Sequence, residues 1–330
     1  MHFYIYLDSS NAEGMDTQAQ VIEKINTTQG KVVFKRFQSK RFKEIFIEKF
    51  FFFNGLLAIL ILAGIFSLLF IKAYPAIREL GLKAFFGSAV WNPTSYSIPR
   101  YGILSLINST LMVTIGALAI AVPLGVACAA FISEVASPRI REIVKPAFEI
   151  LAAIPSVVVG FLGIVMVNPL IAKVFGISNG LNALNGSVLL AIMSLPTIIS
   201  LSEDALRAVP KTYKEASLAL GANDWQTLVR VSVPSALSGI IASIMLGMGR
   251  AIGETMTVLM ATGNAPALTF NLFDAVQTMT ATIAIELGEV PYNTTHYYAL
   301  FVIGLVLFVM TFLVNLISDV ILQKYQEVER

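Results

Sequence analysis

The chain has 330 residues, of which 56% are hydrophobic and only 13% are charged. A soluble protein would carry about 25% charged residues, so this deficit indicates an integral membrane protein. The single cysteine, Cys128, excludes a disulfide framework, and the two histidines, His2 and His296, are too far apart in sequence to pair as metal ligands. We therefore expect no metal site.

A membrane-spanning helix needs about 20 mostly apolar residues. Six stretches meet or approach this length, and they lie at 51–71, 103–132, 150–172, 187–201, 235–261 and 297–318. Pro123, Pro155 and Pro196 fall inside three of them, either as tolerated kinks or as bends that allow rearrangement. We expect the fourth span to be short and broken at Pro196. The pattern predicts an all-α integral membrane protein with six transmembrane helices.

The predicted spans divide the chain into segments. Residues 1–48 form a cytoplasmic segment whose start is expected to be disordered, with Met15 as an alternative start to Met1. Residues 49–72 form an anchor helix, which is too long and too far from the start for a cleavable signal peptide. The remaining segments are an external loop at 73–102, a core of five spans at 103–322 and a cytoplasmic tail at 323–330.

Lysine and arginine counts predict the orientation of these segments. With the N-terminus inside, the inner segments hold seventeen Lys and Arg residues and the outer loops hold five. Cytoplasmic loops carry this excess, so both termini are expected in the cytoplasm. We interpret the basic N-terminal segment as a topology signal beside anionic lipid and not as a nucleic-acid site.

The inner loop at 202–234 has the composition of two short helices. The first, in YKEASLALGA, is predicted to stop at Gly221. The second, NDWQTLVRV, is predicted to start at Asn223 as its N-cap and to end before Pro234. Such a knob is either a docking site for a soluble partner or a plain connector.

This loop resembles the EAA motif of ABC importer permeases, in which EAA is followed by three residues, Gly, nine residues and I-x-L-P. The matching positions are Glu215, Ala216, Ser217, Gly221, Val231, Val233 and Pro234. The chain departs from the motif with Ser for the second Ala and Val for both aliphatic residues. The resemblance implies that the Glu215–Gly221 segment forms a coupling helix that docks on an ATP-hydrolysing subunit.

Further motifs narrow the resemblance. EILAAIPSVVVGFLG at 149–163 and GRAIGETMTV at 249–258 are similar to phosphate importer permeases, and GETM together with TATIAIELGE at 280–289 resembles their PstC-type subunit. The resemblance implies a type I ABC importer permease fold in the inner or plasma membrane. It also implies three partners: an ATPase dimer, a second PstA-like permease subunit and an extracytoplasmic phosphate-binding protein that docks on 73–102 and 262–296.

The chain is not expected to be an enzyme. It has no GxxxxGK[ST] pattern for ATP, no HExxH, and no nucleophile–base motif or paired catalytic carboxylates within its spans. We expect no cofactor, with ATP bound by the partner subunit. The implied function is import of inorganic phosphate; the alternatives are import of another oxyanion (sulfate or molybdate) and a non-conducting scaffold or phosphate-signalling subunit.

Arg250 and Glu254 stand inside the fifth predicted span, where a charge costs about 2.5–3.5 kcal/mol. Their i, i+4 spacing predicts that they share one helix face and partly neutralise each other. They form either a structural salt bridge or part of an anion path. In a path, the arginine fork suits phosphate, and the carboxylate could accept a hydrogen bond from protonated phosphate, which sulfate cannot donate.

Small neighbours of this pair have two interpretations each. Thr255 and Thr257 either add hydroxyl donors to the path or bond back to the backbone. The Gly249–Gly253 pattern predicts close packing against another helix. The resemblance implies that this helix lines the path, and the candidate path residues are Arg250, Glu254, Thr255 and Thr257.

Overall fold

The structure is a computed structural model that describes residues 46–326. The predicted disordered start, the choice between Met1 and Met15 and the last four residues of the tail lie outside this range. The chain divides into two compact units, residues 1–65 and 66–330. A helix at Phe46–Leu80 contains the predicted anchor, and every side chain from 46 to 65 is exposed. Such an apolar exposed surface is typical of a helix that faces lipid.

The prediction of an all-α membrane protein is confirmed. Five helices in the described range are long and apolar enough to cross a membrane: Phe46–Leu80, Leu104–Val135, Ser156–Phe175, Ala183–Ala208 and Thr295–Ile321. A sixth span is possible where Asp224–Ser235 and Leu237–Gly253 join at a bend of 69°. The described chain also holds one short antiparallel ribbon, β1 (Trp91–Asn92) with β2 (Arg100–Tyr101).

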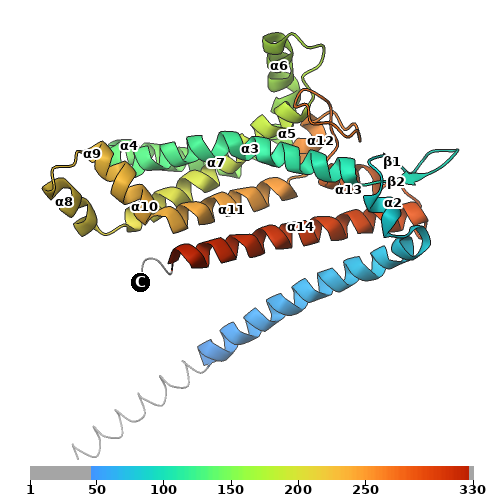
Figure 1. Ribbon diagram of the computed structural model, residues 1–330, viewed down its shortest axis with the longest axis horizontal. Helices are drawn as coiled ribbons and strands as arrows, with labels where there is room; N and C mark the ends of the chain where they lie inside the picture. The colour runs from blue at the N-terminus through green and yellow to red at the C-terminus, as the bar shows by residue number, and fades with distance from the viewer. Residues whose placement is uncertain (1–45, 327–330) are drawn as a thin grey trace, which may run out of the picture. The chain divides into compact units, whose positions relative to one another are not determined.

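The helices follow one another in chain order (Figure 1). In the first half they are α2 (Leu82–Phe86), α3 (Leu104–Ala130), the π-helix η1 (Phe131–Val135), α4 (Pro138–Ala153), α5 (Ser156–Leu162), the π-helix η2 (Gly163–Val167) and α6 (Asn168–Phe175). In the second half they are α7 (Ala183–Ala208), α8 (Lys211–Ala219), α9 (Asp224–Thr227), the π-helix η3 (Leu228–Ser232), α10 (Val233–Ser235), α11 (Leu237–Gly253), α12 (Met256–Ala261), α13 (Met279–Glu286) and α14 (Thr295–Gln326).

The predicted break at Pro196 is wrong. Pro196 is buried within α7, which runs for 26 residues without interruption. A proline in a helix removes one hydrogen bond, but α7 is packed on several sides, and this packing holds the helix together. Pro123 likewise lies inside the continuous α3. Pro155 does mark a break, because its extended backbone (ψ 138°) separates α4 from α5.

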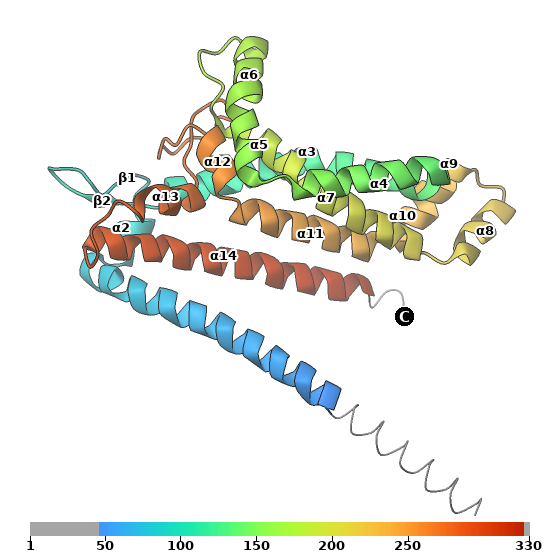
Figure 2. The ribbon, with the colours of Figure 1, turned by 180° about the vertical axis from the view of Figure 1, so that it is seen from behind.

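Helix α7 is the centre of the second unit, and α3 and α11 lie along it (Figures 1 and 2). Glycines bring the backbones close: a Cβ added at Gly239 of α11 would lie 2.4 Å from the Cβ of Ala205 in α7. The predicted packing role of Gly249 and Gly253 is not seen within this chain. A Cβ at Gly249 would approach only Asn315 Oδ1, at 3.9 Å, and one at Gly253 would meet no described atom within 4 Å.

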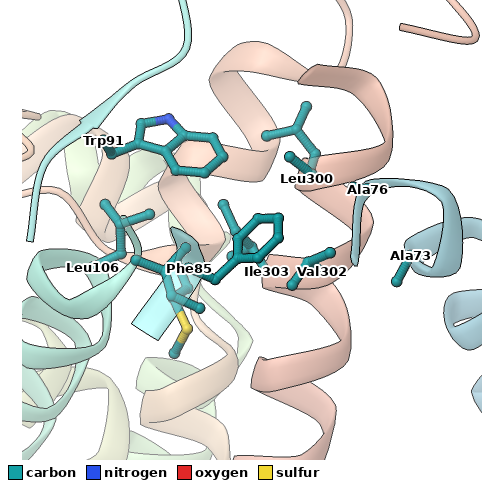
Figure 3. Close-up of a cluster of buried hydrophobic side chains, with 11 residues drawn as sticks. Ala73, Ala76, Phe85, Trp91, Leu106, Leu300, Val302 and Ile303 are labelled. Atoms are coloured by element: carbon teal, nitrogen blue, oxygen red, sulfur yellow. The ribbon is translucent and has the colours of Figure 1, made fainter. Parts of the chain in front are cut away.

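A cluster of buried hydrophobic side chains lies at the end of the unit opposite α8 and α9 (Figure 3). Its labelled members are Ala73, Ala76, Phe85, Trp91, Leu106, Leu300, Val302 and Ile303. The Trp91 indole N–H donates to Glu286 Oε1 at 2.8 Å, and His296 Nε2 lies 2.7 Å from Glu286 Oε2. These contacts fix the segments around 73–102 and 262–296 to the bundle.

The α7–α11 contact predicts a position-specific effect of one methyl group. Gly239→Ala should lower the thermal unfolding midpoint of the detergent-solubilised protein, because the new Cβ meets a rigid Cβ and overpacking costs about 1–3 kcal/mol. Gly249→Ala is the matched control in the same helix, and it should leave the midpoint unchanged or raise it, since Ala favours helix. Equal midpoints for the two variants would contradict the close contact.

Candidate functional site

The charged pair of the fifth predicted span lies at a helix break. Helix α11 ends at Gly253, Glu254 has an extended backbone (φ −67°, ψ 132°), and α12 begins at Met256. Arg250 is in the last turn of α11, whereas Glu254 lies beyond it. The predicted shared helix face is therefore wrong, because i, i+4 spacing places two side chains together only in an unbroken helix.

The predicted mutual neutralisation is also wrong. No ion pair joins Arg250 to Glu254, and none links Arg250 to any other side chain in the described range. Glu254 is half-buried, and its Oε1 lies 3.4 Å from the backbone N and 3.3 Å from the hydroxyl of Thr257. The carboxylate thus covers the start of α12, where amides lack helical partners and the helix dipole favours negative charge.

The two threonines differ in their surroundings. Thr257 is fully buried, and its single hydroxyl proton has three acceptors in reach: Ser156 O of α5 at 3.1 Å, Met193 Sδ of α7 at 3.1 Å and Glu254 Oε1. Thr255 donates to Gly253 O at 3.3 Å, which is the backbone bonding considered from the sequence. Thr257 therefore positions Glu254 and α12, while Thr255 satisfies the end of α11.

Thr280 is a residue of this site that sequence reasoning did not single out. Its hydroxyl donates to Glu254 O at 2.8 Å, in the first turn of α13. Thr278 caps the same helix by accepting from Ala281 N at 3.3 Å. The Thr280–Glu254 contact joins residues 26 positions apart, so no local pattern could have indicated it.

Residues 46–326 leave the face of α11 around Arg250 largely uncovered. Arg250 and Gly253 are exposed, Leu246 is 59% exposed, and a Cβ added at Gly249 would meet only Asn315 Oδ1 within 4 Å. Lipid cannot solvate a guanidinium, so this face requires water or a protein partner.

The inner loop forms the two predicted helices, with corrected limits. Helix α7 extends to Ala208, so Ser202 is helical and the loop begins at 209. Gly221 follows α8 with φ +87°, which glycine adopts without strain, and Asn223 caps α9 through a capping box with Gln226. The predicted stop before Pro234 is wrong, because the helical run continues through η3 and α10.

The knob formed by α8, Gly221 and α9 presents a mixed surface. Glu215 and Ala216 are exposed, and the Ser217 hydroxyl lies 2.9 Å from Thr227 Oγ1. Four large apolar side chains are also exposed, by 45–90%: Tyr213, Leu218, Leu220 and Trp225. Grouped apolar side chains on a polar segment indicate a protein interface, and a tryptophan in so polar a stretch was a signal available in the sequence.

Comparison with known proteins identifies the family of this chain. The family described as "binding-protein-dependent transport system inner membrane component" matches residues 121–327. A probable ABC transporter permease, YqgH of Bacillus subtilis, is 42% identical over 69% of this chain and 74% of its own length. The phosphate transport system permease PstC of Mesorhizobium japonicum is 34% identical over 82% of this chain and 87% of its own length.

Solved structures share the fold at lower sequence identity. A chain of the MetNI methionine ABC transporter, in inward-facing conformations, has a TM-score of 0.51 and 20% identity, over 68% of this chain and 94% of that one. A chain of a bacterial alginate ABC transporter, in complex with a periplasmic protein, has a TM-score of 0.53 and 18% identity, over 80% and 92%. The family match covers more than half of the sequence, and the chain belongs to the binding-protein-dependent transport system inner membrane components.

Proposed function

We propose that this chain is a permease subunit of an ATP-driven importer that moves inorganic phosphate into the cytoplasm. The similarity to a phosphate transport system permease over 82% of the chain carries this proposal. An exposed arginine at a break between α11 and α12 supports an anionic substrate. In this proposal the chain holds no cofactor, and a partner subunit binds and hydrolyses ATP.

The anion path runs along the uncovered face of α11, opposite a second, PstA-like permease subunit. The Arg250 guanidinium offers two parallel hydrogen bonds to phosphate oxygens. Glu254 lies one residue beyond the helix end and accepts a hydrogen bond from the protonated oxygen of phosphate. Thr255 lines the same break. Thr257 is buried and does not face the path; its hydroxyl holds Glu254 and α12 in place.

The knob docks on an ATPase dimer. Glu215, Ala216, Ser217 and Gly221 supply the motif positions, and Pro234 lies in the helical run that connects the knob to α11. The exposed Leu220 and Trp225 supply apolar area for the contact. The carboxyl end of α14 lies toward the same end of the unit as α8 (Figures 1 and 2), which supports a cytoplasmic C-terminus. The cytoplasmic N-terminus rests on the lysine and arginine counts.

The opposite end, with β1, β2 and α13, faces outward and receives an extracytoplasmic phosphate-binding protein. Its segments around 73–102 and 262–296 are held by the Trp91 cluster, so they present a fixed surface. A structurally similar chain comes from a transporter solved with a periplasmic protein, which supports a partner of this kind.

Arg250→Gln tests the path. In vesicles that carry the whole complex, wild type should take up labelled phosphate when ATP is supplied. The uptake rate of the variant should be lower by a factor of about ten or more, because a charged hydrogen bond is worth about 1.5–3 kcal/mol. Arg250→Lys, which keeps the charge but loses the fork, should fall between them. Lys173→Gln, which removes the charge of an exposed residue in α6, is the matched control.

The same assay separates the alternatives. Competition by sulfate or molybdate, or uptake of these without phosphate, would identify a permease for another oxyanion. A chain that binds the ATPase and passes no substrate would be a scaffold. Full transport by an assembled Arg250→Gln complex would place this residue outside the path.

Glu254→Gln tests the discrimination between oxyanions. The glutamine carbonyl can still accept from Thr257, so the helix start is preserved while the charge is lost. We expect the ratio of phosphate to sulfate uptake to fall by about tenfold, which corresponds to about 1.4 kcal/mol. An unaltered ratio at unaltered assembly rejects the role of the charged carboxylate in accepting a hydrogen bond from protonated phosphate.

Glu215→Lys tests the docking of the knob. The substitution reverses an exposed charge on α8 and should reduce the amount of ATPase that co-purifies with the permease by about tenfold. Glu142→Lys makes the same change on an exposed position of α4 and should leave co-purification intact. Equal recovery of ATPase from both variants would remove Glu215 from the interface.

A further inference from the structure

Helix α8 rests on the bundle through few contacts. None of its nine residues is buried. Two side-chain interactions tie it to other elements in the described range: Ser217 with Thr227 of α9, and Lys214 Nζ with Glu134 Oε1 of η1, at 2.5 Å. Both side chains of the ion pair are only about one-fifth exposed, at 22% and 19%, so solvent screens this pair less than a surface pair.

Neighbouring residues of α8 point to different surroundings. Lys214 is half-buried and faces η1, whereas Glu215 is exposed. Adjacent helical residues point about 100° apart, so one helix can contact the bundle with one side chain and a soluble partner with the next. The ion pair and the docking motif are therefore adjacent but separable.

Glu134 lies in η1, directly after α3, and hydrogen bonds and ion pairs hold η1 to α4 and α7. The Arg141 guanidinium of α4 donates to the carbonyls of Ile132 at 2.6 Å and Ser133 at 2.7 Å, which satisfies carbonyls near the end of the helix. Helix α4 is in turn fixed to α7, because Lys145 pairs with Glu203 at 2.9 Å and Asp204 at 3.2 Å.

The buried carboxylate among these contacts, Glu203, has two cationic partners, Lys145 and Arg207. Glu203 is 1% exposed and also pairs with Arg207 at 3.3 Å. The hydrogen bond to Glu203 raises the pKa of Lys145 above its ordinary value, although partial burial opposes this. Lys145 therefore stays charged throughout the physiological range, and η1, α4 and the end of α7 form one connected support.

We propose that the Lys214–Glu134 pair is a transmission link, which makes α3 follow α8 when the partner ATPase moves the knob. The inference rests on the proposed function. Helix α11 follows α8 through the short run of α9, η3 and α10, but the backbone route from α8 to α3 passes through all of α4 to α7. The ion pair joins α8 directly to η1 at the end of α3, so the support made of η1, α4 and the end of α7 moves with the knob and with α11. Glu134 and Lys214 are positioning residues.

Charge reversal tests the link in the complete complex. Glu134→Lys and Lys214→Glu should each leave the ATPase bound but lower phosphate imported per ATP hydrolysed by about fivefold or more, and the double reversal should restore it to within about twofold. Glu142→Lys on α4 is the charge-matched control. Single variants with the wild-type ratio, or a double reversal no better than the singles, would overturn the proposal.

A second readout does not depend on the substrate. Cys128, the single cysteine of the chain, lies in the last turn of α3 before η1. Its rate of labelling by N-ethylmaleimide should change between the resting complex and the complex trapped with ATP and vanadate, in wild type and in the double reversal but not in the singles. No change in wild type overturns the link. A normal Cys128 response without phosphate uptake supports the link and rejects the proposed substrate.

Discussion

A helix break within the bundle has to satisfy its own backbone, and the rest of the site depends on how it does so. Unpaired amides and carbonyls at membrane depth cost several kcal/mol each. Between Gly253 and Met256, the Glu254 carboxylate covers the start of α12, Thr280 donates to the Glu254 carbonyl, and Thr255 donates to Gly253. These bonds direct the Glu254 carboxylate toward α12, and Arg250 has no ion-pair partner in the described range. The free charge that we propose for the anion path is therefore a consequence of how the helix break satisfies its backbone.

The two ends of the second unit differ in how much ionic contact supports their apolar packing. Around Trp91 and Phe85, buried apolar side chains form one close-packed cluster, which resists small displacements. Around Glu203 and Glu134, ionic links join η1, α4, α7 and α8 beside a smaller apolar cluster that contains Ala129, Leu206 and Ile240. Ionic links transmit force along defined directions without a large buried area. The end that is proposed to receive a moving partner is the end that carries these ionic links.

Local signals predicted the local structure well. The caps at Gly221 and Asn223 were identified because a glycine stop and an Asx cap act within four residues of chain. The break at Pro196 was predicted wrongly because packing around α7 outweighs one lost hydrogen bond. The end of α11 was missed although Gly253 is a plausible helix stop, since the spacing of Arg250 and Glu254 favoured a continuous helix. The Thr280–Glu254 and Lys214–Glu134 contacts join distant segments, which no spacing rule reaches.

The exposed guanidinium on α11 bears on how the subunit matures in its membrane. A charge that faced lipid in a lone chain would cost about 2.5–3.5 kcal/mol, which is a large fraction of the stability of an ordinary domain. The proposed second subunit, with water at the contact, would remove that cost and favour the assembled form over the lone chain. Chains made in excess would therefore unfold and be degraded. The subunits would then accumulate in equal numbers without separate regulation of their synthesis.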